Sequence, residues 1–125
     1  MTKYLVPASI LSMAALFAGV AQAAAPVKTV DGLLVNSSGM TLYTFDKDTA
    51  GNGKSVCNGP CAELWPPVAA AADAMPEGDM TIVVRDDGAK QWAHKGKPVY
   101  LFKSDMKAGD VKGDNVKNVW HVIKP

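Results

Sequence analysis

The pattern Tyr-x-Phe-x-x-Asp occurs twice in this chain, as YTFDKD at residues 43–48 and as YLFKSD at residues 100–105. Six of the seven aromatic residues after position 24 fall into three pairs at a separation of 57 or 55 residues: Tyr43 with Tyr100, Phe45 with Phe102, and Trp65 with Trp120. Internal repetition of this kind is typical of folds made of duplicated supersecondary units. We therefore expect two related β units, at about residues 33–68 and 90–124.

Short apolar segments separated by Gly-, Asn- and Asp-containing turns predict a mainly β fold with antiparallel sheets. The expected strands are residues 32–36, 40–45, 80–85, 90–95, 99–102 and 119–124. Pro60 suits the first turn of a helix at residues 60–65, because it has no N–H to leave unpaired, and Pro66 would end that helix. The Ala-rich residues 68–75 are expected to form a second short helix.

The first 23 residues have the pattern of a secretory signal peptide. Lys3 precedes an apolar run, and Ala21-Gln22-Ala23 provides small residues at the expected cleavage site. The apolar run is shorter than the roughly 18–20 residues that a membrane-spanning helix needs, so an uncleaved anchor is the weaker alternative. We expect residues 24–125 to form one domain, a monomer in the periplasm or the medium with no membrane span.

Charge composition argues against a nucleic-acid partner. Residues 24–125 contain 12 basic and 12 acidic side chains, and Arg85 is the only arginine. Nucleic-acid-binding domains usually concentrate Lys and Arg on one face. Asp and Glu exceed Lys in residues 24–80, whereas Lys and Arg exceed Asp in residues 81–125, a split that fits two docked halves or two solvated faces.

Cys57 and Cys61, the only cysteines, form the sequence CNGPC. Export to an oxidising compartment favours a disulfide, which pins local geometry. Two alternatives remain open. The thiols could bind Cu(I) together with His121, since thiolate and imidazole suit that ion, or they could exchange electrons as a thiol–disulfide couple.

The repeated motif residues have a structural and a functional interpretation. Tyr43 and Phe45 share one face of a strand, so core packing is the first expectation for them and for their counterparts Tyr100 and Phe102. If exposed, the rings would instead offer an aromatic platform for a sugar or a quinone. Asp48 and Asp105 are expected to shape the loops that follow them by binding backbone N–H groups.

A cation site is the alternative for the acidic clusters, which are Asp46, Asp48 and Asn52 in the first loop and Asp105, Asp110 and Asp114 in the second. The EF-hand pattern is not matched, because Ala50 stands at its fifth position. The chain also has no Gly-x-Ser-x-Gly elbow, no His-Glu-x-x-His helix and no phosphate-binding loop. We therefore expect no enzyme, no cofactor and no metal site.

The combined motifs resemble a known bacterial family. GMTLYTFDKD followed by CNGPCAELWPP, and GKPVYLFKSD followed by GDVKGDNVKNVWHVI, are similar to the "secreted repeat of unknown function" family, described as predicted lipoproteins with a Yx(F/W/Y)xxD motif. The resemblance covers the chain from about Val30 onward and implies export without assigning an activity. The lipid anchor does not carry over, because no cysteine lies near the expected cleavage site. The sequence predicts a non-enzymatic binding or structural module of the cell envelope, with unknown partners; the alternative is a periplasmic copper-binding or redox accessory protein.

Overall fold

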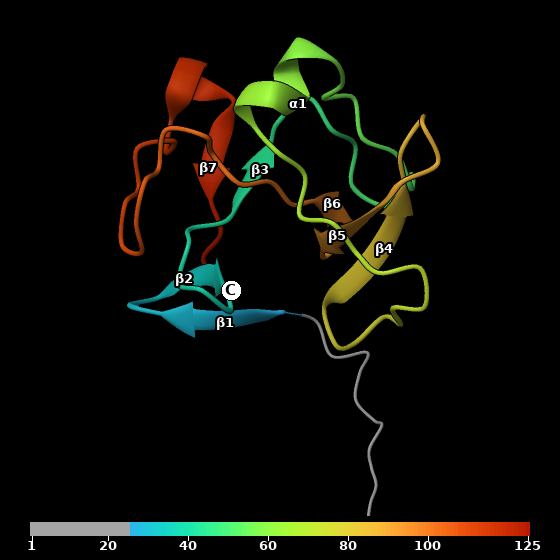
Figure 1. Cartoon of the computed structure of the whole chain (residues 1–125), viewed down its shortest axis with the longest axis horizontal. Coiled ribbons are helices and arrows are strands. Elements are labelled where there is room, and N and C mark those ends of the chain that lie inside the picture. The colour runs from blue at the N-terminus through green and yellow to red at the C-terminus, as the bar shows by residue number, and fades with distance from the viewer. Residues whose placement is uncertain (1–25) are drawn as a thin grey trace, which may run out of the picture.

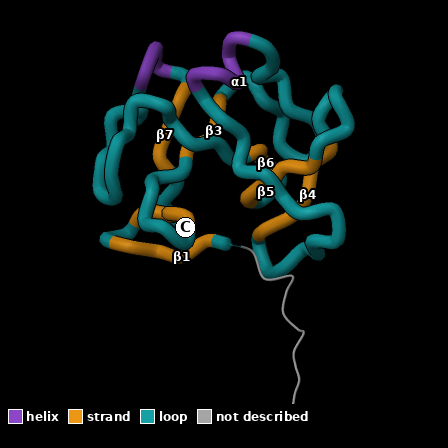
Figure 2. Tube along the Cα trace, viewed as in Figure 1, coloured by secondary structure: helices purple, strands orange, loops and turns teal. Residues whose placement is uncertain are grey.

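The computed structural model describes residues 26–125, so the expected signal peptide at residues 1–23 lies outside the described part. The fold is mainly β, with three small antiparallel sheets connected by long loops (Figures 1 and 2). This confirms the predicted fold class. Within residues 26–125, no helix has the length and apolar character needed to cross a bilayer.

The strands are β1 (Val27–Val30), β2 (Leu33–Asn36), β3 (Tyr43–Phe45), β4 (Met80–Val84), β5 (Lys90–His94), β6 (Lys97–Pro98) and β7 (Trp120–Val122). The helix α1 (Pro60–Leu64) and a 3₁₀ turn, η1 (Val116–Asn118), complete the elements. One sheet pairs β1 with β2, a second pairs β3 with β7, and the third has the order β4–β5–β6. Helix α1 begins at Pro60 and ends before Trp65, as the prolines on either side predict.

The first hairpin includes a strand that the sequence interpretation missed. β1 pairs with β2, and the turn between them consists of Asp31 and Gly32 at positive φ of 51° and 80°. Asp-Gly is a preferred pair for a type I′ turn because both central residues need positive φ. The turn expected at residues 37–39 is also present, since the Asn36 N–H donates to the Met40 carbonyl.

The prediction of a helix at residues 68–75 is wrong. Residues 68–70 are extended and residues 71–74 form a turn closed by the Ala74 N–H and the Ala71 carbonyl. The extended part is hydrogen-bonded on both sides: the Val68 N–H donates to Val99, and the Val68 carbonyl accepts from Trp92. Ala70 donates to Lys90 in the same way. The alanines favour a helix locally, but these bonds to distant residues override a preference of less than about 1 kcal/mol per residue.

The two sequence repeats meet along their tyrosines. Tyr43 and Tyr100 form an antiparallel bridge in which each N–H donates to the other's carbonyl at 2.9 Å. In addition, β3 from the first repeat pairs with β7 from the second, so that Phe45 lies opposite Trp120. The sheet that contains the first motif is therefore built from both repeats.

Because successive side chains of a strand point to opposite faces of the sheet, the buried side chains form two separate clusters. Leu42 and Val99 belong to an aliphatic cluster with Trp92, whereas Tyr43 and Tyr100 belong to an aromatic one. The remaining members of the aliphatic cluster are Leu34, Val68, Met80 and Ile123. The remaining members of the aromatic cluster are Phe45, Cys57, Trp65 and Trp120. The aromatic cluster thus contains five of the six repeated aromatic residues, and Phe102 is partly buried against it.

Two equivalent glycines let the loops of opposite repeats approach. Gly39 has φ of +85°, and a Cβ atom there would lie 2.9 Å from Cβ of Ala108. Gly96 has φ of +87°, and its Cβ atom would lie 2.8 Å from the backbone nitrogen of Gly51. Both positions need glycine for backbone conformation and for space. Each repeat is therefore fitted closely against the glycine-rich loop of the other.

Candidate functional site

Crossed hydrogen bonds join the two copies of the motif. The hydroxyl of Tyr43 donates to Oδ2 of Asp105 at 2.6 Å. The hydroxyl of Tyr100 donates to Oδ2 of Asp48, also at 2.6 Å. Both tyrosines are completely buried, and the two aspartates are only 5–6% exposed. Bonds of this length between a hydroxyl and a carboxylate are the strong, charge-assisted kind. Each motif is thus completed by the aspartate of the other copy.

The second oxygen of each carboxylate fastens the loop that follows it. Oδ1 of Asp48 accepts from the Val56 N–H at 2.7 Å, and Oδ1 of Asp105 accepts from the Lys112 N–H at 2.8 Å. These bonds span eight and seven residues, so they close most of each glycine-rich loop. Each aspartate therefore organises its own loop and holds the tyrosine of the opposite repeat.

The two dyads differ in their third partner. The Tyr43 hydroxyl accepts from the Gly113 N–H at 3.1 Å. The Tyr100 hydroxyl lies 2.6 Å from Oγ of Ser55. Since Tyr100 gives its single hydroxyl hydrogen to Asp48, Ser55 must be the donor in this contact. The two dyads are otherwise alike: the Ser55 hydroxyl contacts one tyrosine where the Gly113 N–H contacts the other.

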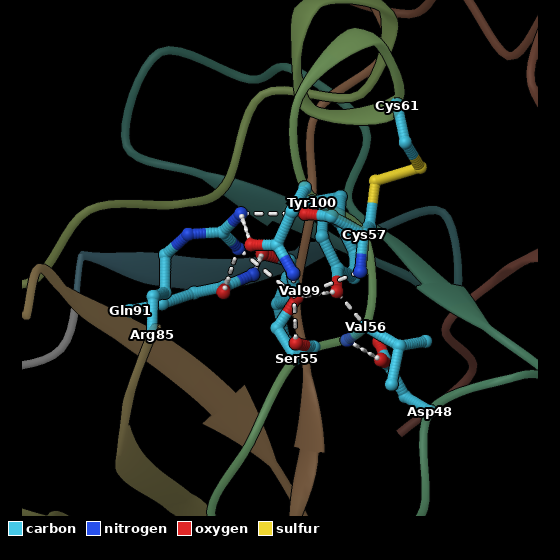
Figure 3. The surroundings of a disulfide bond; sticks show 10 residues. Asp48, Ser55, Val56, Cys57, Cys61, Arg85, Gln91, Val99 and Tyr100 are labelled. Atoms are coloured by element: carbon cyan, nitrogen blue, oxygen red, sulfur yellow. Dashed lines mark hydrogen bonds between the residues drawn. A yellow bond between two sulfur atoms is a disulfide. The ribbon is translucent and has the colours of Figure 1, made fainter. Parts of the chain in front are cut away.

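A buried arginine supports the Ser55 side of the network (Figure 3). Arg85 is 5% exposed, and its Nη1 donates to Oγ of Ser55 at 3.0 Å and to Oε1 of Gln91 at 2.7 Å. Its Nη2 donates to the Cys57 carbonyl and to Oδ1 of Asn58. A chain of donors therefore runs from the guanidinium through Ser55 and Tyr100 to the Asp48 carboxylate.

Burial controls the ionisation of these groups. Desolvation raises the pKa of Asp48 above its usual value, although the hydrogen bond from Tyr100 and the positive charges of Lys97 and Arg85 oppose the shift. Desolvation also raises the pKa of Tyr43 and of Tyr100, and the neighbouring carboxylates raise both further. The tyrosines are therefore held as neutral hydroxyl donors.

Four parallel rings form a column beside the tyrosines. Phe45 stacks on Trp120 with ring centroids 4.2 Å apart, Trp120 on Trp65 at 3.8 Å, and Trp65 on Phe102 at 4.1 Å. The interplanar angles are 12°, 3° and 18° in the same order. Tyr43 and Tyr100 meet the tryptophans edge-on. Since the rings alternate between the first and the second repeat along the column, stacking also joins the two copies.

A groove of about 400 Å³ runs beside this column. The residues that line it are Phe45, Lys47, Cys61, Leu64, Trp65, Phe102, Ser104, Val116, Lys117, Val119 and Trp120. Ten of them form five pairs at the repeat spacing of 57 or 55, such as Phe45 with Phe102 and Leu64 with Val119. Only Lys117 has no counterpart in the lining. The groove therefore straddles the boundary between the repeats.

Cys57 and Cys61 are joined by a disulfide (Figure 3). Cys57 is completely buried and belongs to the aromatic cluster, whereas Cys61 is partly exposed and lines the groove. The ring nitrogens of His121 contact Oδ2 of Asp46 at 2.8 Å and Oδ1 of Asn115 at 3.2 Å. In the described part of the chain, no three His, Cys, Asp or Glu side chains are grouped so that they could hold a metal ion. The structure does not assemble a copper site from Cys57, Cys61 and His121.

The acidic loop residues also have protein partners. Asp46 binds His121, and Asn52 accepts from the Lys54 N–H. In the second loop, Asp110 accepts from the Met106 N–H, the Lys107 N–H and the Lys107 ammonium group. Asp114 accepts from the Val122 N–H. These carboxylates organise the loops.

Three polar residues of the network were not found by sequence reasoning: Ser55, Arg85 and Gln91. The sequence marks Arg85 only as the sole arginine and as the last residue of an expected strand. Ser55 and Gln91 carry no local signal, since serine and glutamine are usually exposed. Their burial depends on contacts between segments far apart in the chain.

A family model described as a secreted repeat of unknown function matches the chain twice, at residues 25–69 and at residues 81–124. Each matched segment contains one Tyr-x-Phe-x-x-Asp motif and one tryptophan of the stacked column. No curated protein and no solved structure matches the chain.

Proposed function

This chain belongs to the family of secreted repeats of unknown function, and from that premise we propose that it is a non-enzymatic binding module of the cell envelope. Its binding site is the groove beside the aromatic column. The observation that carries this proposal is the composition of the groove, which has a volume of about 400 Å³, a mainly apolar lining and equivalent residues from both repeats. Pockets of this size and character are typical of small-molecule sites.

The side chains that could most readily act as an acid or a base are hydrogen-bonded to each other inside the protein. Both tyrosine–aspartate dyads are buried and satisfied within the protein. A general acid or base must reach a substrate proton within hydrogen-bond distance, and groups that bond each other in the interior are poorly placed for that. Their roles are to hold the two repeats together and to support the column that forms one wall of the groove.

Export to the periplasm or the medium is part of the same proposal. The family is described as secreted, residues 1–23 have the signal-peptide pattern, and the disulfide fits an oxidising compartment. Fractionation of expressing bacteria, followed by intact-mass measurement, tests it. A chain that begins at about Ala24 and is found outside the cytoplasm is expected.

Binding can be tested with two fluorescent dyes that have the same ring system. These are 8-anilinonaphthalene-1-sulfonate, which is anionic, and N-phenyl-1-naphthylamine, which is neutral. Leu64 lies on the groove and is 54% exposed, so Leu64→Glu places a charge there without disturbing the core. Val84→Glu is the matched control, because Val84 is 45% exposed on β4 and does not line the groove.

We expect saturable binding of at least one dye, with one site per chain. Leu64→Glu should weaken it at least tenfold, and Val84→Glu should leave it unchanged. Equal urea midpoints for the two variants would show that both remain folded. If neither dye binds, or if the two variants bind alike, the groove is not the site and the proposal fails.

Thiol–disulfide exchange is a second candidate, favoured by the position of Cys61 in the groove. An incoming thiolate would attack Sγ of Cys61, form a mixed disulfide with it and release Cys57 as the thiolate. Equilibration with glutathione measures the potential of the couple. A value near −200 mV supports exchange, whereas one below about −300 mV is typical of a structural disulfide.

A further inference from the structure

The charged residues that line the groove are all positive, and this indicates a class of ligand. Lys47 and Lys117 are its only charged residues, and no carboxylate lines it. Both lysines are exposed, and among residues 26–125 neither forms a salt bridge. Their positive charge is therefore available to a ligand.

The two lysines belong to the same end of the aromatic column. The segments that carry them are joined directly, since the N–H of Asp46, the residue before Lys47, donates to the carbonyl of Val119, two residues after Lys117, at 2.7 Å. Both segments adjoin the end of the column where Phe45 stacks on Trp120. At the other end, formed by Trp65 and Phe102, the equivalent of Lys47 is Ser104, and Leu64 provides an apolar wall. The two ends of the groove are therefore built from equivalent residues but differ in charge, because only one end carries lysines.

The column presents ring edges to the groove. Because four stacked rings all line the groove and the faces of the two tryptophans are covered by neighbouring rings, the groove must run along the side of the column, where ring edges form its wall. Aromatic edges are electropositive and faces electronegative, so edges pair best with the face of another ring. An aromatic body is therefore favoured over an aliphatic chain of equal size.

We propose that the groove binds a small aromatic acid, with its rings against the column edges and its acidic group at the end formed by Lys47 and Lys117. This proposal rests on the binding function proposed above and adds the chemical class of the ligand. A volume of about 400 Å³ suits a molecule with two or three rings. The lysines would supply orientation and modest affinity, since an exposed ion pair contributes no more than about fivefold to an affinity.

Comparison of the two dyes in the charge variants tests the acidic group. We expect the sulfonate dye to bind several-fold more tightly than its neutral analogue. Lys47→Gln and Lys117→Gln should each weaken the sulfonate dye about two- to fivefold and leave the neutral dye unchanged. Lys124→Gln, at an exposed lysine outside the groove, should affect neither dye.

Competition tests the aromatic body. 2-Naphthoate should displace the sulfonate dye at a lower concentration than decanoate, an aliphatic acid of similar size. If decanoate competes equally well, the aromatic preference is wrong. If Leu64→Glu abolishes binding but the lysine variants do not weaken the sulfonate dye, the acidic group is wrong while the binding function stands. If no dye binding depends on Leu64, both proposals fail.

Discussion

The crossed pairing makes a quantitative prediction that the sequence motif alone would not. In the structure Tyr43 binds Asp105 and Tyr100 binds Asp48, so each tyrosine should be energetically coupled to the aspartate 62 or 52 residues away. It should not be coupled to the aspartate of its own motif. Double-mutant cycles measure this difference directly.

The expected magnitude follows from the contacts of the Tyr43 hydroxyl. Tyr43→Phe removes the donor to Asp105 and the acceptor of the Gly113 N–H while keeping the ring. A buried group left without a partner costs about 1–3 kcal/mol, and bonds to charged groups lie at the upper end. We therefore expect a loss of about 2–3 kcal/mol in the free energy of unfolding. Asp105→Asn keeps an acceptor for the Lys112 N–H and removes the charge that strengthens the tyrosine bond.

Urea denaturation followed by tryptophan fluorescence provides the measurement, with reductant absent so that the disulfide stays intact. The cycle of Tyr43→Phe with Asp105→Asn should give an interaction energy of about 1–2 kcal/mol, within the range for directly bonded residues. The cycle of Tyr43→Phe with Asp48→Asn should be additive to within about 0.5 kcal/mol, because the Tyr43 hydroxyl and the Asp48 carboxylate have no hydrogen-bond partner in common. Coupling within one motif and additivity across the two would refute the crossed arrangement.

Three further predictions concern the tyrosines, the disulfide and the buried arginine. Because burial raises the pKa of Tyr43 and Tyr100 above 10.0, the folded state keeps protons that the unfolded state releases. Their stabilisation is therefore complete below pH 10 and lost above it, at up to about 2.7 kcal/mol per pH unit for two groups. In a chain that begins at Ala24, which keeps only these two tyrosines, absorbance at 295 nm should show tyrosinate only as the protein unfolds, and early titration of the native protein would contradict this. Replacing Cys57 and Cys61 by serine should lower the free energy of unfolding by about 2 kcal/mol, since the closed loop is short; urea midpoints check this, and no loss would show that the bond does not constrain the unfolded chain. Arg85→Lys should destabilise by about 1.5–3 kcal/mol, because an ammonium group cannot reach the four acceptors of the guanidinium fork; an unchanged thermal midpoint would mean that the buried network contributes little.

The parts of the fold that the sequence predicted are those with local signals. Helix α1 begins at Pro60 and ends before Pro66, β4 and β5 flank a turn that contains Gly88, and the repeat identified the aromatic residues that form the column. β1 could also have been predicted, because Asp31-Gly32 is a strong type I′ signal. Local signals sufficed wherever a turn or a proline decided the conformation.

The remaining features depend on contacts between distant segments. Residues 68–75 have alanines that favour a helix, yet bonds to Lys90, Trp92 and Val99 make residues 68–70 extended. The repeat indicated that each aspartate shapes a loop, but nothing in one motif shows that its aspartate binds the tyrosine of the other. The groove likewise depends on the stacking order of the rings, and the bond between the Asp46 N–H and the Val119 carbonyl brings the segments of Lys47 and Lys117 to the same end.

The crossed bonds also explain why the two repeats depend on each other. A single repeat would bury a tyrosine hydroxyl or a carboxylate without its partner, and a stacked column of four rings would be reduced to one phenylalanine and one tryptophan from the same copy. In the structure those two rings do not touch, since Phe45 stacks on Trp120 and Phe102 on Trp65. Neither copy contains a complete set of its own contacts. The smallest unit that satisfies the motif is therefore the pair, and the groove arises only where the pair meets.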